Sequence, residues 1–251
     1  DNTWSPEFYL WFKWDNDNLD PGETFDIIEG EVISKQKLSE YHKHGEHYAK
    51  YLVKAQITKY FDSLRFPVDD HILTIVIEDG KLPWKDLEYV SDAEHSSISS
   101  RVKLPGYVVT KHSLIMKPHT YKTNFGDPRL SSTNHATFSQ HLYGATISRD
   151  GLGIYFKIFL GLFAAVSISL LAFFIKPTDV DPRFGLGVGG FFGAIANSLL
   201  SISFVADNGN LSLLDIVNNV AIISIFLTLV ASTISLYIFD IRGEIELSRL
   251  L

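Results

Sequence analysis

Hydrophobic and polar positions divide the chain into two unlike parts near residue 150. Beyond that point three apolar runs follow one another, each about 22 residues long or slightly longer: Ile154–Ile175, Phe184–Val205 and Ile216–Phe239. At a rise of about 1.5 Å per residue, such a run forms a helix of roughly 33 Å, enough to cross a hydrocarbon core of about 30 Å. The one formal charge within the runs, Lys157, is close enough to a helix end to reach the headgroups. The pattern predicts three transmembrane helices.

The first 150 residues have the polar, strand-like pattern of a water-soluble β domain. Tyr51–Thr58 alternates partly between apolar and polar residues, as a strand with one solvated face does. Other short runs are rich in β-branched and aromatic residues: Phe8–Trp14, Phe25–Ile33, Tyr48–Tyr60, Ile72–Ile77, Gly106–Met116 and Leu142–Ser148. Many short strands separated by turn residues predict an antiparallel β-sandwich. We therefore expect a β + α membrane protein, with an outer β-sandwich over residues 1–150 and a transmembrane helical bundle over residues 151–251.

Composition and charge exclude several classes of function. The net charge is −7, and no basic stretch is interleaved with aromatic residues, so we expect no nucleic-acid partner. The chain has no cysteine, which excludes a disulfide framework and a thiolate metal site. Neither a nucleophile–base constellation nor a glycine-rich phosphate loop is present, so we expect no enzyme and no cofactor.

Charged residues next to the apolar runs predict the orientation of the chain in a membrane. The first connection carries Lys176 and Arg183, and the tail carries Arg242 and Arg249, whereas the second connection, Ala206–Asp215, has acids and no base. Because positive charge favours the cytoplasmic side, the first connection and the tail are expected in the cytoplasm. We therefore expect a multi-pass protein of the cell (inner) membrane, with its N-terminal domain in the periplasm or the extracellular space.

One stretch in the β part has a recognisable sequence. Lys59–Leu73 (KYFDSLRFPVDDHIL) resembles the signature loop of the pentameric ligand-gated ion channels, the Cys-loop receptor superfamily. In eukaryotic members two cysteines bracket this loop, so the chain is similar to the prokaryotic type, which lacks them. The resemblance continues in order, because Arg149 precedes the first apolar run and residues 183–188 (RFGLGV) resemble the start of the pore-lining helix. Family members have a fourth transmembrane helix, and we expect one here as well.

The resemblance implies a function. It predicts a homopentamer in the lipid bilayer, with a central pore for small ions that is lined by the second transmembrane helix. The pore would open when the outer domain binds an unidentified small molecule or ion. The main alternative is a non-conducting, membrane-anchored sensor or scaffold, in which the sandwich binds a ligand and the helices anchor it.

The second apolar run contains a stripe of residues spaced three or four apart, which places them on one face of a helix. These candidate pore-lining residues are Gly185, Gly189, Phe192, Ala196, Leu199 and Ser203. In a five-fold bundle Phe192 and Leu199 would form apolar rings, which can block ions by dewetting. The alternative is that the small residues only permit close packing of helices.

Charges at the expected cytoplasmic mouth of the pore bear on ion selectivity. Asp181 would attract cations, as would the acidic outer domain. Arg183, followed by a Gly-Leu-Gly sequence, instead resembles the anion-type members of the family. We expect selectivity for cations.

The resemblance also implies a set of coupling residues between the two domains. In the family, an acid of the signature loop meets the arginine before the first helix, near the acidic first inter-strand loop. The corresponding residues here are Asp69 and Arg149, with Pro67 in the signature loop and Asp17 in the acidic loop. A charge-assisted pair has two discrete arrangements, made and broken, which suits signal transmission. The alternative is that each residue is a solvated turn charge.

Ligand-binding residues are also implied by the resemblance. Trp84, Tyr121 and Phe138 fall in regions where the family builds an aromatic cage at the subunit interface. Such cages hold cationic amines by cation–π attraction. Plain packing of the aromatic side chains is the alternative.

Two polar segments are candidate metal sites. The first contains Asp15, Asp17 and Asp20, whose carboxylates can supply oxygen ligands to a calcium ion that modulates the protein. The alternative is that these aspartates belong to a solvated turn. His42, His44 and His47, with Glu46, can bind a transition metal or sense protons at about pH 6–7. The alternative for the histidines is a flexible polar loop.

Overall fold

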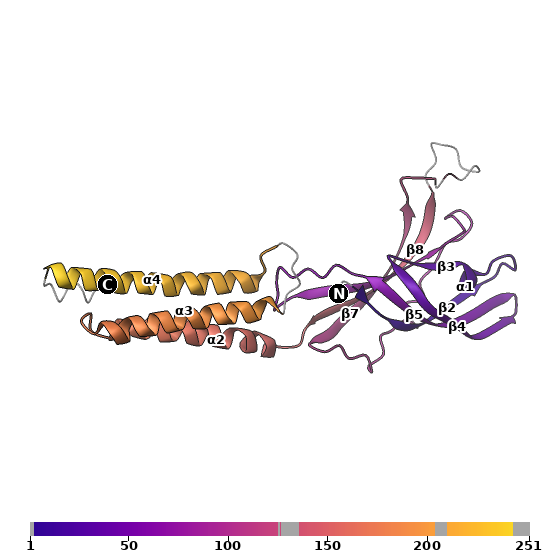
Figure 1. Cartoon of the computed structure of the whole chain (residues 1–251). Coiled ribbons are helices and arrows are strands. Elements are labelled where there is room, and N and C mark those ends of the chain that lie inside the picture. Colours follow the sequence, from indigo (N-terminus) through magenta and orange to yellow (C-terminus); the bar gives the residue numbers. More distant parts are fainter. Residues whose placement is uncertain (1–2, 125, 127–135, 204–209, 243–251) are drawn as a thin grey trace. The chain divides into compact units, whose positions relative to one another are not determined.

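The structure is a computed structural model that describes residues 3–124, 126, 136–203 and 210–242 (Figure 1). The chain divides into two compact units. The β unit consists of Asp1–Phe61 and Asp70–Ile147, and the helical unit of Asp62–Asp69 and Ser148–Leu251. The helical unit thus takes in part of the signature loop, from the middle of the strand-rich sequence.

The β unit contains two four-stranded sheets. In the first sheet β5 (Glu46–Thr58) pairs antiparallel with three other strands, which are β1 (Thr3–Trp4), β2 (Glu7–Trp14) and β4 (Gly30–Lys43). The second sheet has the order β3 (Phe25–Ile28), β6 (Asp70–Asp79), β8 (Thr137–Arg149) and β7 (Tyr107–Thr120). A short helix, α1 (Pro21–Thr24), precedes β3.

Both sheets contribute to one hydrophobic core. Along β5 every second residue from Ala49 to Ile57 is buried, because successive side chains of a strand point to opposite faces. Tyr51 and Val53 of β5 cluster with Ile75 and Ile77 of β6. The alternation in Tyr51–Thr58 predicts a strand with one solvated face, and the apolar residues of this pattern are the ones buried in the core.

The expected polar loop around the three histidines is a β-hairpin instead. The predicted strand Phe25–Ile33 is divided at Glu29, which has a φ of 62°, into β3 and the start of β4. Strand β4 then continues for 14 residues, nearly all exposed, and pairs with β5 as far as Lys43 opposite Glu46, with His42 opposite His47. His44 and Gly45 form a turn with φ values of 55° and 84°, a pair of left-handed residues that suits a two-residue hairpin turn. The prediction of a flexible polar loop was wrong because β4 is held by backbone pairing with β5. It has no apolar face that the sequence pattern could reveal.

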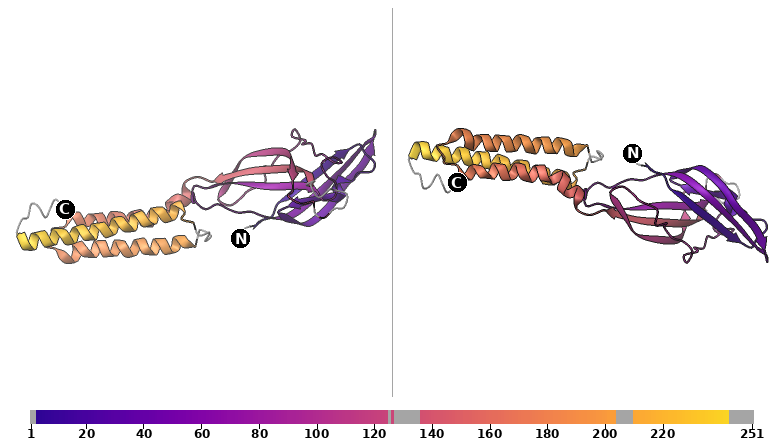
Figure 2. Two further views of the ribbon diagram at one scale, coloured as in Figure 1. Left: turned by 90° about the horizontal axis from the view of Figure 1, so that it is seen from above. Right: turned by 90° about the horizontal axis from the view of Figure 1, so that it is seen from below.

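Three long helices make up the rest of the helical unit, and they run side by side (Figures 1 and 2). Helix α2 (Gly153–Leu170) continues as a 3₁₀ turn, Leu171–Phe174; α3 spans Val180–Ile202 and α4 spans Leu213–Arg242. They share an apolar cluster that includes Phe159 and Leu162 of α2, Ala194 of α3, and Leu214 and Ile225 of α4.

In the part of the chain that the structure describes, two helices rather than the three expected are long and apolar enough to cross a membrane: Gly153–Phe174 and Leu213–Ile241. The predicted ends of the first and third runs lie within a few residues of the observed helices. Residues 204 and 205 of the second predicted run, like Asp207 and Arg249, lie outside the described residues.

Candidate functional site

The part of the signature loop that belongs to the helical unit is anchored on the helices. Phe66 is buried and packs in the same apolar cluster as Phe159 and Leu214. The Leu64 carbonyl accepts a hydrogen bond of 2.8 Å from the Leu213 amide, at the first residue of α4. Burial of the phenyl ring and this backbone bond hold the loop against the start of α4.

Asp69 and Arg149 form an ion pair within the helical unit. Arg149 Nε donates to Asp69 Oδ1 at 2.9 Å, and Nη2 donates to Oδ2 at 3.4 Å. The Asp69 side chain is 5% exposed and that of Arg149 is 18% exposed. The guanidinium carbon also lies 5.0 Å from the centre of the Phe66 ring, in cation–π range. Two-point bonding of a guanidinium to a largely buried carboxylate is among the stronger polar contacts in proteins.

The structure therefore brings together two of the predicted coupling residues, which are 80 positions apart in the sequence. Pro67 lies in the same loop, fully buried, after a cis peptide bond from Phe66. Asp17 belongs to the β unit, where its carboxylate is bonded to His47.

The predicted stripe on α3 faces away from the other two helices. Phe192 and Leu199 are 66% and 65% exposed, and the remaining members of the stripe are exposed as well. A Cβ atom added at Gly185 or Gly189 would meet no neighbouring atom within 4 Å. Packing within this chain therefore does not explain why these two positions are glycine.

The opposite face of α3 packs closely on α2 and α4. At Gly190 an added Cβ would lie 2.7 Å from the carbonyl oxygen of Ala165 on α2, closer than a real Cβ atom approaches. At Gly187 it would collide with the side chain of Leu229 on α4. The two explanations for the glycines thus apply to different faces: Gly187 and Gly190 permit helix packing, while Gly185 and Gly189 leave an open surface.

The two charges predicted at the pore mouth have different surroundings. Asp181 is exposed in the first turn of α3. Arg183 is 3% exposed and lies on the packed face, with its Nε and Nη1 each 3.3 Å from a hydroxyl of α4, on Ser232 and Ser235. The guanidinium is therefore directed into the helical unit and away from the stripe.

A polar contact joins α3 and α4 among apolar residues. Asn197 Nδ2 donates to Asn218 Oδ1 at 3.2 Å, and Asn218 is 1% exposed. Asn197 is adjacent to the stripe residue Ala196 without belonging to the stripe. An asparagine inside an apolar run was the available sequence signal, because such a residue is expected to face protein or water.

The three predicted ligand-binding aromatics lie together near the start of β8. The Trp84 amide donates to the Thr137 carbonyl at 2.8 Å, and the Tyr121 amide donates to the Ala136 carbonyl at 2.9 Å. The Tyr121 and Phe138 rings are 5.9 Å apart in an edge-to-face arrangement. Backbone pairing thus gathers residues from three separate segments of the chain.

An acidic side chain that sequence reasoning missed lies beside these aromatics. Glu78 is 5% exposed, and its carboxylate accepts hydrogen bonds from the Tyr121 hydroxyl at 3.0 Å and from Gln140 Nε2 at 2.7 Å. Burial and the bond to Glu78 raise the pKa of Tyr121 to about 12, so its hydroxyl remains a hydrogen-bond donor near neutral pH. Glu78 supplies negative charge next to an aromatic group, a combination suited to a cation.

The chain matches no protein-family model and is not significantly similar to any curated protein. Functional proposals for it therefore rest on its own residues.

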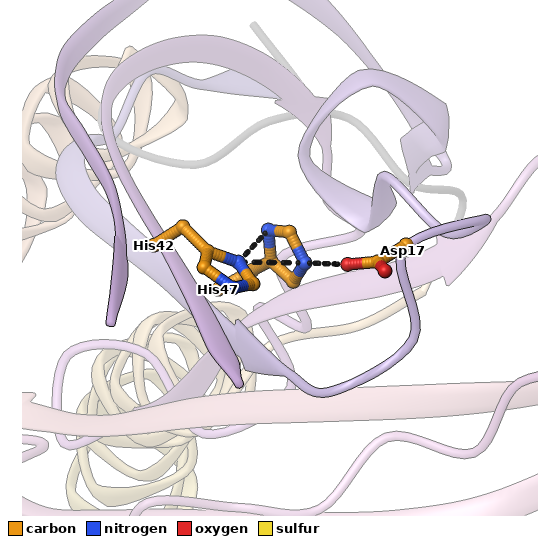
Figure 3. A group of neighbouring side chains, drawn as sticks. All are labelled: Asp17, His42 and His47. Carbon is orange, nitrogen blue, oxygen red and sulfur yellow. Dashed lines mark hydrogen bonds and ion pairs between the residues drawn. The ribbon is translucent and has the colours of Figure 1, made fainter. Parts of the chain in front are cut away.

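The acidic loop places its three candidate calcium ligands in different surroundings. Asp15 is exposed, and Asp20 precedes α1 with one carboxylate oxygen buried and unpaired. Asp17 instead joins two of the predicted metal-binding histidines, His42 and His47 (Figure 3). Among the described residues these are the three acidic or histidine side chains whose ligand atoms lie within 4.8 Å of one another.

Proposed function

We propose that the chain is a subunit of a pentameric ligand-gated ion channel, in which α3 lines a central pore and the β unit binds a ligand outside the cell membrane. The observation that carries the proposal is the exposed stripe on α3. The spacing of the stripe residues places them on one face of the helix, and the family resemblance assigns that face to the pore. This face is left uncovered while the other face of the helix is packed.

The composition of the stripe suits a gated pore. Five copies around an axis would each contribute Phe192 and Leu199, which form two apolar rings that exclude water when narrow. Gly185 and Gly189 would leave the pore wider toward the start of α3. The outer surfaces of α2 and α4 are also apolar, with exposed residues such as Leu160 and Phe226, and lipid is the medium that such surfaces require.

The surroundings of the two mouth charges favour cations. Asp181 is the exposed charge in the first turn of α3, whereas Arg183 is held by hydroxyls of α4. A ring of five Asp181 carboxylates at the mouth would concentrate cations and repel anions.

The Asp69–Arg149 pair would couple the two units. The chain passes between the units three times, after residues 61, 69 and 147. Asp69 is the last residue before the second passage, and Arg149 is the second residue after the third. A ligand that shifts the β unit would therefore act on the backbone next to both members of the pair, and the pair can be made or broken.

A second candidate function is a non-conducting sensor or scaffold anchored in the membrane. It is favoured by the finding that only α2 and α4 among the described helices are long and apolar enough to span a bilayer. In that case α3 would lie against a partner protein, and its stripe would be a docking surface without contact to a water-filled pore.

Thiol accessibility distinguishes the two functions, because the chain contains no cysteine and an introduced one is the only thiol. Ala196→Cys tests the stripe, Ala194→Cys tests the packed face, and Leu227→Cys tests the exposed surface of α4. In liposomes a charged thiol reagent should label Ala196→Cys alone, because a thiol in hydrocarbon stays protonated and unreactive. Equal labelling of Ala196→Cys and Leu227→Cys, or none of either, would contradict a pore lined by α3.

A further inference from the structure

Three ligand atoms from two separate segments of the β unit converge beside β5. Asp17 lies in the loop between β2 and α1, and His42 and His47 lie directly opposite each other on β4 and β5. His47 Nε2 is 3.0 Å from His42 Nδ1 and 2.7 Å from Asp17 Oδ1 (Figure 3). All three side chains thus direct polar atoms to one point.

The cluster brings one carboxylate oxygen next to two imidazoles whose ring nitrogens are close together. His42 Nδ1 lies 3.1 Å from His47 Nδ1 and 3.0 Å from His47 Nε2. A neutral imidazole carries a proton on one of its two nitrogens and keeps a lone pair on the other. A cation bound among the three atoms interacts favourably with every lone pair at once. We propose that Asp17, His42 and His47 form a binding site for Zn²⁺.

The three ligand atoms lie within 4.8 Å of one another. A tetrahedral zinc ion with bonds of about 2.0–2.1 Å holds its ligand atoms about 3.3 Å apart. The two contacts at His47 Nε2, 3.0 and 2.7 Å, would therefore lengthen by about 0.3 and 0.6 Å when zinc binds. Two imidazoles and one carboxylate are ligands that zinc accepts, with the fourth position open to water. Calcium and magnesium prefer oxygen ligands, so this set does not suit them.

Neighbouring contacts orient the site before any metal binds. Trp14, His47 and His42 are consecutive cross-strand neighbours in the first sheet. The His47 ring stacks on the Trp14 indole, with centres 5.2 Å apart and planes 13° apart. The side chain of His47 is 23% exposed, while Asp17 and His42 are open to solvent. One ligand is therefore held in place, and the other two leave the site accessible to ions.

Metal binding would connect two elements that the backbone joins only through a long path. Asp17 would be tied to the end of the β4–β5 hairpin, across 24 intervening positions before His42. A ligand that binds the folded chain better than the unfolded chain stabilises the fold. Zinc should therefore raise the thermal unfolding midpoint of the protein.

Calorimetric titration of the full chain in detergent with ZnCl₂ tests the site. Wild type should bind one zinc per chain, and His42→Ala should lose more than about tenfold in affinity. Asp17→Asn should also weaken binding, while keeping the size of the side chain. The matched control is His44→Asn, which removes an imidazole from the same hairpin turn and tolerates the positive φ of that position. The control should bind zinc as wild type does.

The proposal is overturned if wild type shows no saturable binding, or if His42→Ala binds zinc as tightly as His44→Asn. A second measurement uses fluorescence in place of calorimetry. Cu²⁺ also accepts imidazole ligands, so Cu²⁺ bound to His47 should quench the fluorescence of Trp14, on which the His47 ring stacks. Quenching should be lost in His47→Ala and reduced in Trp14→Phe. Equal quenching in wild type, His47→Ala and Trp14→Phe would place the metal elsewhere.

Discussion

Replacing Asp69 with asparagine removes one charge of the ion pair and keeps the shape of the side chain. Arg149 then remains largely buried, 18% exposed, with no carboxylate from position 69. Loss of one member of a buried pair costs about 3–5 kcal/mol, because the remaining charge loses the compensation that its partner supplied. Since Arg149 retains some contact with water, we expect Asp69→Asn to lower the free energy of unfolding by about 3 kcal/mol.

The interaction between the two residues is isolated by a double-mutant cycle with Arg149→Gln. Unit charges about 4 Å apart attract by roughly 4 kcal/mol at an effective dielectric constant of about 20. Screening through the exposed part of Arg149 reduces this, so we expect a coupling energy of about 2 kcal/mol, within the range found for residues in contact. Chemical unfolding in detergent, followed by tryptophan fluorescence, provides the four stabilities.

The control is an exposed ion pair in the same chain. Lys54 Nζ lies 2.8 Å from a carboxylate oxygen of Glu7, but both side chains are more than half exposed, at 52% and 53%. Exposed pairs of this kind couple by about 0.2–1 kcal/mol. The reasoning is refuted if the coupling between Asp69 and Arg149 is no larger than that between Glu7 and Lys54.

Two further predictions concern stability. Gly190→Ala should destabilise the protein by about 1–3 kcal/mol, because the new methyl group would press on the Ala165 carbonyl. The control, Gly189→Ala, has open space for its methyl group and should be neutral or stabilising. Equal thermal unfolding midpoints for the two variants would contradict the assignment of the two helix faces. Burial lowers the pKa of His141 below its usual value, so the unfolded chain binds more protons and stability should fall as the pH drops through about 6.5. Denaturant titrations at several pH values should show a shallower pH dependence for His141→Gln, and an unchanged dependence would exclude this residue as a cause.

Periodicity in the sequence predicted most of the secondary structure, and it failed where a strand has no buried face. The first and third apolar runs predicted α2 and α4, because each run is long and continuously hydrophobic. Strand β4 was missed from residue 34 onward because its exposed polar side chains give no alternation. The His44-Gly45 pair was the available signal for a hairpin turn at that point.

The functional residues differ in how far sequence could locate them. The spacing of the α3 stripe predicted which residues share a face, and that face is exposed. The proximity of Asp69 to Arg149 came from family resemblance, since spacing says nothing about contacts between residues so far apart. For the same reason Asp17 could not be assigned to the two histidines, nor Glu78 to the aromatic group. The burial of Arg183 depends on hydroxyls of α4 that a pattern within α3 does not contain.

If α3 lines an ion-conducting pore, ions should cross liposome membranes that contain the purified protein. Flux should be measured under opposed cation and anion gradients for wild type, scanned against pH and calcium, and for Phe192→Ser, which replaces an exposed apolar ring with a hydroxyl that water can wet. Basal flux in Phe192→Ser should exceed that of wild type, with a reversal potential that follows the cation. Absence of flux from both proteins, when each is verified as a folded pentamer, would contradict a pore lined by α3.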